Sequence, residues 1–571
     1  MVNLIKYFVK SAVIAGKTCS LLIVLFSFCL YQSAFAQETS SQDLSLEPDY
    51  LVSDFDELIE KKIEEKKNES KLANDKSVKI SSLPKIADER LEKPASLAEI
   101  LSDFEVAAQK IQKDWNIAGM AVAISIDGKI VYKKVFGIRD AVSKEKVNYQ
   151  TIFQIGSCTK AFTAMLAGML ADRGIIKWDD RVIDYIPTFQ LSNPDITKNI
   201  TIEDLLSQNS GLIPYSQHFM LLFGYSRQQI LQGLKFVRTY GKFRQSYGYQ
   251  NNLFLLAGEV MQYASGFPWE ENLQKLILTP LKMDSTTMDY QSYVSAENKT
   301  KGHYWKGGSF VPASDKLPYN IWPYTFAPAG GINTNIDDFS KWLAFLTSDG
   351  IVGKKRLISQ ASMDRIFSKK VFNKESNYYY CLGWRLSNGT GEDIFWHGGT
   401  TDMQGAYISF IRDKKIGVAV LMNLNNVPAA QSMALMFYDA YLGKPKTDWN
   451  QKNLARSAAR QKSRDAAAKK SVKEPIKPLP LERYAGSYRN NMYGAVIVKL
   501  ENGKLKFSAG SYKTWLTLKH TDKNTFGAES IPGWTFKQQE FKFQVDKTST
   551  VISMTIADMS DSTDSLFKKQ K

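Results

Sequence analysis

The sequence predicts a mixed α/β (α+β) protein: an antiparallel sheet flanked by helices, with a helical lobe, followed by a small all-β barrel-like domain. Strand-like runs at residues 120–135 and 406–422 lie on either side of a mostly helical middle section, so we expect both ends of this region to share one sheet. From about residue 481 onward, apolar and polar residues alternate as they do in strands. The chain has 571 residues, 44% of them hydrophobic, which is enough for two or three domains with cores of their own.

Residues 1–36 have the pattern of an export signal. Lysines precede the apolar run at 21–30, and Ala34-Phe-Ala36 supplies the small residues of a cleavage site. The apolar run is too short to span a bilayer comfortably. We therefore expect a cleaved signal peptide and an exported protein, periplasmic or secreted, with an uncleaved anchor as the alternative.

Residues 37–93 form a charge-dense extension in which glycine and proline are scarce. Val52, Phe55, Ile59 and Ile63 recur at helical spacing, which predicts an amphipathic helix. This helix would be either a solvated spacer or a docking element for the main domain or for another copy.

The main domain is expected over residues 94–443. Asp127-Gly128 between two β-type runs is a strong hairpin signal, and Thr201 is suited to cap a short helix. The expected elements are a helix at 97–115, strands at 120–126 and 129–135, mostly helices from 157 to about 286, a helix at 338–346, strands at 406–411 and 416–422, and a helix ending near 441.

Residues 444–480 are predicted to be an Ala/Lys/Arg-rich linker whose centre can form an exposed helix with no apolar face to bury. Residues 481–571 are expected to form a barrel or sandwich of about eight strands. Asn502-Gly503 would be one of its hairpin turns, and Trp515 and Trp534 would fill its core. Its role would be packing, or shaping substrate access or self-association.

Ser157 and Lys160 are the candidate nucleophile and base. They are three residues apart at the start of a predicted helix, so their side chains share one face. A serine needs a group that takes its proton, and a lysine can do so when burial or positive charge lowers its pKa. Backbone N–H groups at a helix start can also hold an oxyanion. The spacing alone is not specific, because Ser82 and Lys85 share it.

Two further stretches carry groups suited to acyl transfer. Tyr249 and Asn251 precede an apolar helix; a phenol can carry a proton, and an amide can donate to a substrate carbonyl and accept from an amine. His397 begins a His-Gly-Gly-Thr sequence that leads into a strand, and an unperturbed histidine titrates near neutrality. The remaining histidines, which are His218, His303 and His520, are expected to be ordinary surface or packing residues.

Together these motifs resemble those of the penicillin-recognising serine hydrolases: class C β-lactamases, D,D-peptidases, D-aminopeptidases and related esterases. Ser-x-x-Lys, Tyr-x-Asn and the glycine-rich motif occur in the order typical of that family, and the resemblance runs from about Leu97 to Tyr441. It implies a β-lactamase-like fold. The C-terminal β segment is similar to a lipocalin-like domain appended to some of these hydrolases.

The resemblance implies a role for each motif residue. Ser157 would form an acyl-enzyme, Lys160 and Tyr249 would share the acid and base work, and which of the two takes the first proton is left open. Asn251 would hold the amide side of the substrate. The backbone N–H groups of Ser157 and Thr400 would form the oxyanion hole. The substrate-binding strand would contribute His397, Gly398, Gly399 and Thr400. Neither a metal nor an organic cofactor is implied.

The third motif departs from that of efficient β-lactamases, in which Lys-Thr-Gly usually stands where this chain has His397-Gly398-Gly399. A permanent charge is thus replaced by a pH-dependent one, which favours a D-amino-acid peptidase or esterase over antibiotic hydrolysis. The expected partner is a small peptide, ester or β-lactam substrate. The alternative is a non-catalytic cell-wall-binding or scaffold protein on a hydrolase fold.

The net charge of +16 suits attraction to anionic cell-wall polymers or membranes, and it equally suits a scattered solvated surface. Arginine-rich stripes interleaved with aromatics are missing, so we do not expect nucleic acid as a partner. Cys158 and Cys381 remain after the signal, too few for a disulfide scaffold, and Cys158 is expected to be structural. The oligomeric state is not indicated.

Overall fold

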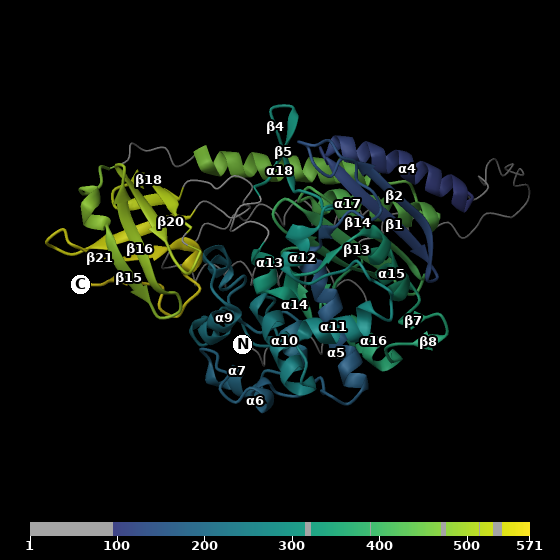
Figure 1. The fold of residues 1–571 in the computed structure, drawn as a ribbon, viewed down its shortest axis with the longest axis horizontal. Helices are drawn as coiled ribbons and strands as arrows, with labels where there is room; N and C mark the ends of the chain where they lie inside the picture. Colours follow the sequence, from purple (N-terminus) through teal and green to yellow (C-terminus); the bar gives the residue numbers. More distant parts are fainter. Residues whose placement is uncertain (1–94, 315–320, 389, 470–475, 513, 529–538) are drawn as a thin grey trace, which may run out of the picture. The chain divides into compact units, whose positions relative to one another are not determined.

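The computed structural model describes residues 95–314, 321–388, 390–469, 476–512, 514–528 and 539–571 (Figure 1). The predicted signal peptide at 1–36, the predicted helical extension at 37–93 and Trp534 lie outside the described residues. Within the described ranges, no helix combines the length and the apolar character that crossing a membrane requires.

An antiparallel sheet of eight strands forms the centre of the main domain, which confirms the predicted fold class. Its strands, in sheet order, are β2 (Lys129–Gly137), β1 (Gly119–Ile126), β14 (Ile416–Met422), β13 (Gly405–Ile411), β12 (Ile394–Thr400), β11 (Arg385–Ser387), β10 (Tyr378–Tyr380) and β9 (Val371–Asn373). Val122 of β1 lies opposite Val420 of β14, so the first and last strands of the domain are neighbours. Strands β1 and β2 form the predicted hairpin, whose turn residues Asp127 and Gly128 both have a positive φ.

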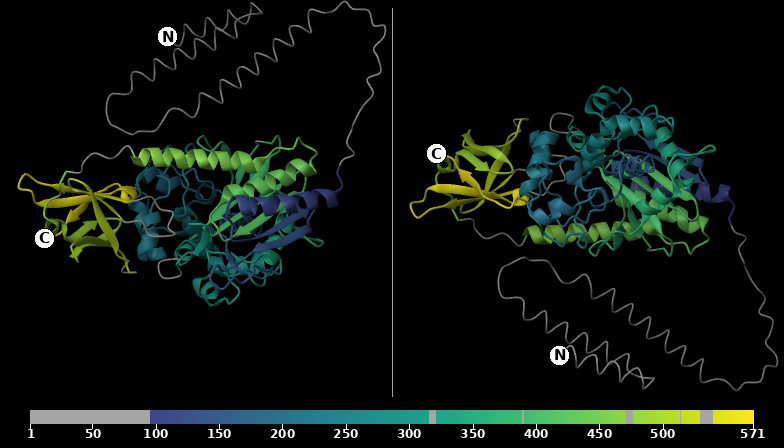
Figure 2. Two further views of the ribbon diagram at one scale, coloured as in Figure 1. Left: turned by 90° about the horizontal axis from the view of Figure 1, so that it is seen from above. Right: turned by 90° about the horizontal axis from the view of Figure 1, so that it is seen from below.

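Helices cover both faces of the sheet: α4 (Leu97–Asp114) and α17 (Val427–Tyr441) on one, and α15 (Ile336–Thr347) on the other (Figures 1 and 2). Side chains alternate along β1 as the pleat requires. Met120 and Val122 belong to the core under α4 and α17, whereas Ala121 belongs to the larger core on the opposite face. The sheet is therefore buried on both sides.

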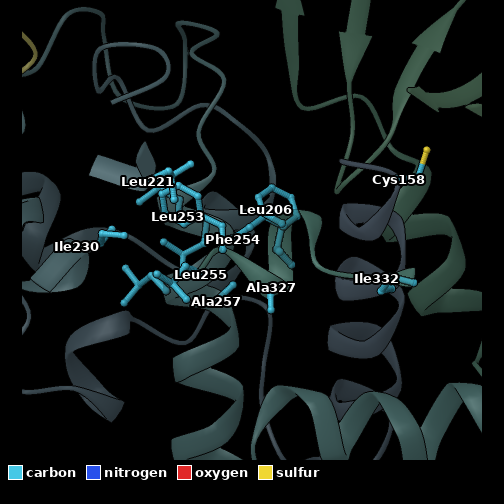
Figure 3. Close-up of a cluster of buried hydrophobic side chains, with 14 of the residues drawn as sticks. Cys158, Leu206, Leu221, Ile230, Leu253, Phe254, Leu255, Ala257, Ala327 and Ile332 are labelled. Carbon is cyan, nitrogen blue, oxygen red and sulfur yellow. The ribbon is translucent and has the colours of Figure 1, made fainter. Parts of the chain in front are cut away.

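The helical lobe is organised around α5 (Thr159–Asp172) and α10 (Asn252–Ser265). Every residue of α5 from Thr159 to Leu170 is buried, so this helix is surrounded by protein on all sides. Figure 3 shows Leu253 and Phe254 of α10 in the same apolar cluster as Leu206 and Leu221.

Shorter elements complete the main domain. Thr201 caps the helix that follows it, as predicted, by accepting a hydrogen bond from the backbone of Asp204 at 3.3 Å. The short helices of the main domain are η1 (Gly156–Cys158), α6 (Val182–Tyr185), α7 (Pro194–Asn199), α8 (Ile202–Leu206), η2 (His218–Phe223), α9 (Arg227–Gly233), η3 (Leu234–Phe236), α11 (Trp269–Leu273), η4 (Gln274–Leu278), α12 (Tyr290–Ser295), α13 (Trp322–Thr325), α14 (Ala327–Gly330) and α16 (Gln360–Phe367). Its short strands form three pairs: β3 (Phe153–Gln154) with β6 (Asn333–Thr334), β4 (His303–Lys306) with β5 (Ser309–Pro312), and β7 (Ile351–Val352) with β8 (Lys355–Arg356).

The C-terminal domain is a closed barrel of eight strands, which confirms the predicted all-β fold. After a short turn η5 (Leu481–Tyr484) come β15 (Gly486–Asn490), β16 (Gly494–Glu501), β17 (Lys504–Ser508), β18 (Leu516–Asp522), β19 (Thr525–Ala528), β20 (Glu540–Val545), β21 (Val551–Ile556), η6 (Ala557–Met559) and β22 (Phe567–Lys569). Its core is filled by buried rings such as Tyr488, Phe507 and Phe541. Trp515 is 36% exposed, so its prediction as a core residue is wrong.

The predicted linker contains a long helix, α18 (Trp449–Lys469), whose first turns are docked by buried asparagines. The Trp115 indole donates to Asn450 Oδ1 at 2.7 Å, and Asn450 Nδ2 donates to the Asp114 carboxylate at 2.6 Å. Asn453 Nδ2 donates to Ser432 Oγ at 2.9 Å. The helix thus lacks an apolar face, as predicted, but polar contacts hold its start against α4 and α17.

Candidate active site

Ser157 lies in η1, directly before α5, where β12 approaches it closely. A Cβ added to Gly399 would lie 1.8 Å from the Ile155 carbonyl oxygen, and one added to Gly156 would lie 2.7 Å from the Thr400 nitrogen. Only glycine permits such an approach, and Gly156 also has a φ of +48°. These glycines bring together the backbones of Ser157 and Thr400, which are the segments expected to form the oxyanion hole.

Lys160 is fully buried, and three oxygens surround its side-chain nitrogen. Nζ lies 3.3 Å from Ser157 Oγ, and it donates to Asn251 Oδ1 at 2.6 Å and to the Ala329 carbonyl at 2.9 Å. All of these neighbours are neutral, so none of them offsets the cost of burying a charge. Burial, followed by the positive charge of Arg385, lowers the pKa of Lys160 well below its ordinary value.

Tyr249 is also buried, and its hydroxyl makes a side-chain hydrogen bond with Ser157. Burial raises the pKa of Tyr249, although the Arg385 charge and the bond with Ser157 act in the opposite direction. The structure shows that burial outweighs them, so the phenol keeps its proton at neutral pH.

Ser157, Tyr249 and Asn251 line one cavity of about 210 Å³. Gly398 and Thr400 line it as well. Its other walls are mainly aromatic or apolar, with Trp322, Phe326 and Val427 among them. The structure therefore gathers the predicted hydroxyl, phenol and carboxamide around one volume, with the Lys160 amine in contact with Ser157 and Asn251.

His397 and Gly399 are on the predicted strand but do not line this cavity. His397 is fully buried, with Nδ1 2.8 Å from the Gly398 carbonyl and Nε2 3.2 Å from the Tyr380 hydroxyl. Because a carbonyl only accepts, Nδ1 carries the proton and Nε2 accepts from Tyr380.

Burial, followed by the charges of Arg385 and Lys160, lowers the pKa of His397 well below its ordinary value. The imidazole is thus neutral at pH 7, which differs from the expectation that it titrates near neutrality. It contacts protein groups at both nitrogens, so its place in the site is that of a positioning residue within β12 and not of a substrate contact.

Three cavity residues carried no signal in the sequence. Arg385 follows a Gly-Trp pair at the start of β11, and its guanidinium carbon lies 4.9 Å, 5.1 Å and 5.7 Å from the ring centres of Trp396, Tyr378 and Tyr249. Its Nε is enclosed and has no hydrogen-bond partner among the described residues. Tyr215 and His218 line the cavity too, and the His218 ring packs against Trp322 with 5.9 Å between the ring centres.

Cys158 and Cys381 are buried free thiols, and burial raises the pKa of each. The Cys158 thiol donates to the His397 carbonyl at 3.3 Å, which agrees with a structural role. Across the described ranges, no group of three or more His, Cys, Asp or Glu side chains is arranged to hold a metal ion.

The antiparallel sheet, the helical lobe and the Ser157–Lys160 pair define the class of β-lactamase-like serine hydrolases. A family model described as Beta-lactamase matches residues 107–438, and the chain belongs to this family. A second model, described as a domain of unknown function (DUF3471), matches residues 470–570.

The chain is similar to several known proteins. Unguisins hydrolase ungD of Aspergillus violaceofuscus is 28% identical over 446 residues, which cover 71% of this chain and 77% of that protein. Protein flp of Staphylococcus aureus (strain MW2) is 26% identical over 314 residues, covering 54% and 60% respectively. The octameric penicillin-binding protein homologue from Pyrococcus abyssi matches with a TM-score of 0.53 at 20% identity, over 82% of this chain and 100% of that one, a likeness of fold alone.

Proposed function

We propose that this protein is an exported serine hydrolase that cleaves an amide or ester through an acyl-enzyme on Ser157. One observation carries the proposal: the environment of Lys160 Nζ. A neutral amine has two N–H groups and one lone pair. Asn251 Oδ1 and the Ala329 carbonyl accept the two N–H groups, which leaves the lone pair for the hydroxyl of Ser157.

The pKa directions favour Lys160 as the first base. Its lowered pKa increases the neutral fraction, whereas the raised pKa of Tyr249 keeps the phenol protonated. In the proposed reaction, Ser157 Oγ transfers its proton to Lys160 and bonds to the substrate carbonyl carbon. The oxyanion is held by the Ser157 and Thr400 N–H groups.

Tyr249 then donates its proton to the leaving nitrogen or oxygen as the scissile bond breaks, and it recovers a proton from protonated Lys160. A water molecule then attacks the carbonyl carbon of the acyl-enzyme and passes a proton to the base formed by Lys160 and Tyr249. The bond to Ser157 Oγ breaks, Oγ takes a proton back from these groups, and the acid leaves. Asn251 fixes Lys160 and has an amide N–H₂ that can meet the substrate carbonyl.

A D-amino-acid peptidase or esterase suits this site better than an efficient β-lactamase. The third motif offers a neutral, enclosed His397 where a permanent cation would hold the carboxylate of the antibiotic. Two relatives bear the name unguisins hydrolase, which supports hydrolysis without identifying the substrate of this chain. Export and cleavage after Ala36 belong to the proposal and rest on the N-terminal sequence.

The proposal is tested by treating the chain from Gln37 onward with a fluorophosphonate and measuring intact mass. We expect one adduct that is lost in Ser157→Ala and retained in Ser143→Ala, a matched control because Ser143 and Lys146 have the same spacing on an exposed loop. A panel of 4-nitrophenyl esters, D-amino-acid anilides and a cephalosporin then ranks the substrates. Absence of both adduct and turnover would favour the scaffold alternative.

Export has its own test. Expression of the full chain followed by N-terminal sequencing of the protein recovered outside the cytoplasm should give Gln37 as the first residue. Recovery of the chain only inside cells and with its N-terminus intact would contradict export.

A further inference from the structure

A second, larger cavity of about 900 Å³ adjoins the catalytic one. The two share Tyr215, Tyr249, Arg385 and Val427 in their linings, so they meet around these four side chains. The volume falls within the range of sites that enclose a whole ligand. A substrate whose carbonyl lies at Ser157 can therefore extend past Arg385 into this space.

The lining of the second cavity is strongly cationic. Arg385 of β11, Lys374 after β9, and Arg456 and Arg460 of α18 all line it, and Glu375 is the one acidic side chain among its described lining residues. None of the four cations forms an ion pair with a carboxylate in the part of the chain that the structure describes. Their charges are therefore open to a ligand.

The docking of α18 explains why its arginines face this cavity. Asn453 is buried against Ser432 of α17. Arg456, Ser457 and Arg460 follow Asn453 at helical spacings of three, four and seven, so they lie on the same side of α18 as Asn453, and both arginines remain exposed beside the cavity. Because α18 lies beyond residues 107–438, this wall is an addition to the part of the chain that the Beta-lactamase family model matches.

Arg385 is suited to hold an anion at the junction of the two cavities. The rings of Trp396, Tyr378 and Tyr249 surround its guanidinium and fix its plane. A guanidinium fixed in this way can bind a carboxylate through two parallel N–H groups. Its partly enclosed position makes such a pair stronger than one on the open surface.

We propose that the second cavity is an extended subsite for the distal part of the substrate, and that the substrate is an acidic peptide whose carboxylates pair with Arg385 and with Arg456 and Arg460. The proposal rests on the proposed hydrolysis at Ser157 and adds the class of substrate. The lining also contains aromatic and amide side chains, such as Trp396 and Asn373, beside the cations. Amide side chains can hydrogen-bond to the backbone of a peptide, and aromatic rings can pack against its side chains.

The test uses hydrolysis of 4-nitrophenyl butyrate and two competitive inhibitors with blocked ends, tetraglutamate and tetraglutamine. At low salt we expect an inhibition constant for tetraglutamate about tenfold below that for tetraglutamine, with the difference shrinking as salt screens the charges. In the double variant Arg456→Gln/Arg460→Gln, the ratio of the tetraglutamine to the tetraglutamate inhibition constant should fall by roughly fivefold. A matched control is Lys452→Gln/Lys462→Gln, which removes two charges of α18 that do not line the cavity and should retain the preference.

Equal inhibition by the two peptides in the unaltered protein would overturn the proposal, as would the same preference in both double variants. Stronger inhibition by inorganic tripolyphosphate than by tetraglutamate would contradict the acidic peptide and indicate that the cavity binds a phosphate-bearing ligand. If Ser157 forms no adduct and no member of the substrate panel is hydrolysed, the proposed function fails, but calorimetric titration of the same peptides into Ser157→Ala still decides the subsite.

Discussion

Asn251 Oδ1 accepts a hydrogen bond from Lys160 Nζ at 2.6 Å. The carboxamide fixes the amine beside Ser157 without adding a negative charge. Ala329 does the same through its backbone carbonyl. The lysine is therefore held by neutral acceptors, while the charge that acts on it most strongly is the positive charge of Arg385, and both conditions favour the neutral amine.

Asn251→Asp should impair the enzyme through the pKa of Lys160. A carboxylate at this position stabilises the ammonium form, so the acid limb of the pH–rate profile should move to higher pH. Each unit of movement lowers kcat/KM at a pH below the limb by about tenfold. The measurement is kcat/KM for a 4-nitrophenyl ester between pH 5 and 10.

Asn251→Ala is the control for this prediction, because it removes the contact without adding a charge. It should lower the rate with little upward movement of the limb. Identical pH profiles for the aspartate and alanine variants would mean that Lys160 is not the group that titrates.

Arg385→Gln should also move the acid limb to higher pH. The positive charge of Arg385 is the second cause of the lowered pKa of Lys160, after burial. Removing it stabilises the ammonium form, so Lys160 loses its proton later as pH rises. Arg385→Lys retains the charge and should leave the limb closer to its original position. A limb that stays in place in Arg385→Gln would exclude this electrostatic link.

His397→Asn should affect stability more than the pH–rate profile near neutrality. The pKa of His397 is lowered in the folded state, so this group contributes stability above its unfolded pKa of about 6.5 and loses it as pH falls toward the folded pKa. At pH 7.5 the variant should lose about 1–3 kcal/mol, because the Tyr380 hydroxyl loses its buried acceptor. At pH 5 the difference from the unaltered protein should be smaller.

Urea unfolding at the two pH values measures this effect. A constant difference would indicate that His397 does not titrate between the folded and unfolded states in this range. Movement of the acid limb of the rate profile by a full unit in His397→Asn would instead point to a direct part in catalysis.

Gly399→Ala should separate the oxyanion segment from the nucleophile. The added carbon would lie 1.8 Å from the Ile155 carbonyl, so β12 and η1 must move apart. A displacement of this size costs roughly a hundredfold in rate when it disturbs catalytic geometry. Urea unfolding of Gly399→Ala beside the unaltered protein is the control that the variant remains folded. Equal kcat in Gly399→Ala and the unaltered protein would contradict the role given to this approach.

The sequence predicted what depends on local pattern. Alternation and turn residues identified β1, β2, β13 and β14, and the motif spacing identified Ser157, Lys160, Tyr249 and Asn251, which the structure brings together. Burial is a property of the whole fold, so the sequence did not show that His397 is enclosed or that the pKa of Tyr249 is raised.

The position of Arg385 and the docking of α18 were missed for a related reason. Arg385 acquires its place from rings that lie 136 residues upstream and 11 residues downstream, at Tyr249 and Trp396. The helix α18 docks through hydrogen bonds of Asn450 and Asn453, and such contacts leave no hydrophobic periodicity to detect.

The C-terminal barrel reaches the wall of the catalytic cavity through Asp561. Its Oδ2 accepts the backbone N–H of Gln217 at 2.5 Å, and its Oδ1 accepts the hydroxyl of Tyr493 at 2.5 Å. Gln217 precedes His218, and it has a φ of +60°, which is uncommon for a residue other than glycine. Asp561 thus holds a strained segment next to a cavity residue.

Asp561→Ala should therefore loosen the cavity wall. We expect KM to rise by at least about fivefold with a smaller fall in kcat, because Ser157 and Lys160 do not contact this segment. The measurement is a full rate–concentration curve for one ester substrate. Asp546→Ala is the control, since Asp546 belongs to an exposed turn of the same barrel and its hydrogen bonds lie within that turn. If Asp561→Ala and Asp546→Ala have the same KM while both remain folded, the barrel serves for packing and does not shape access to Ser157.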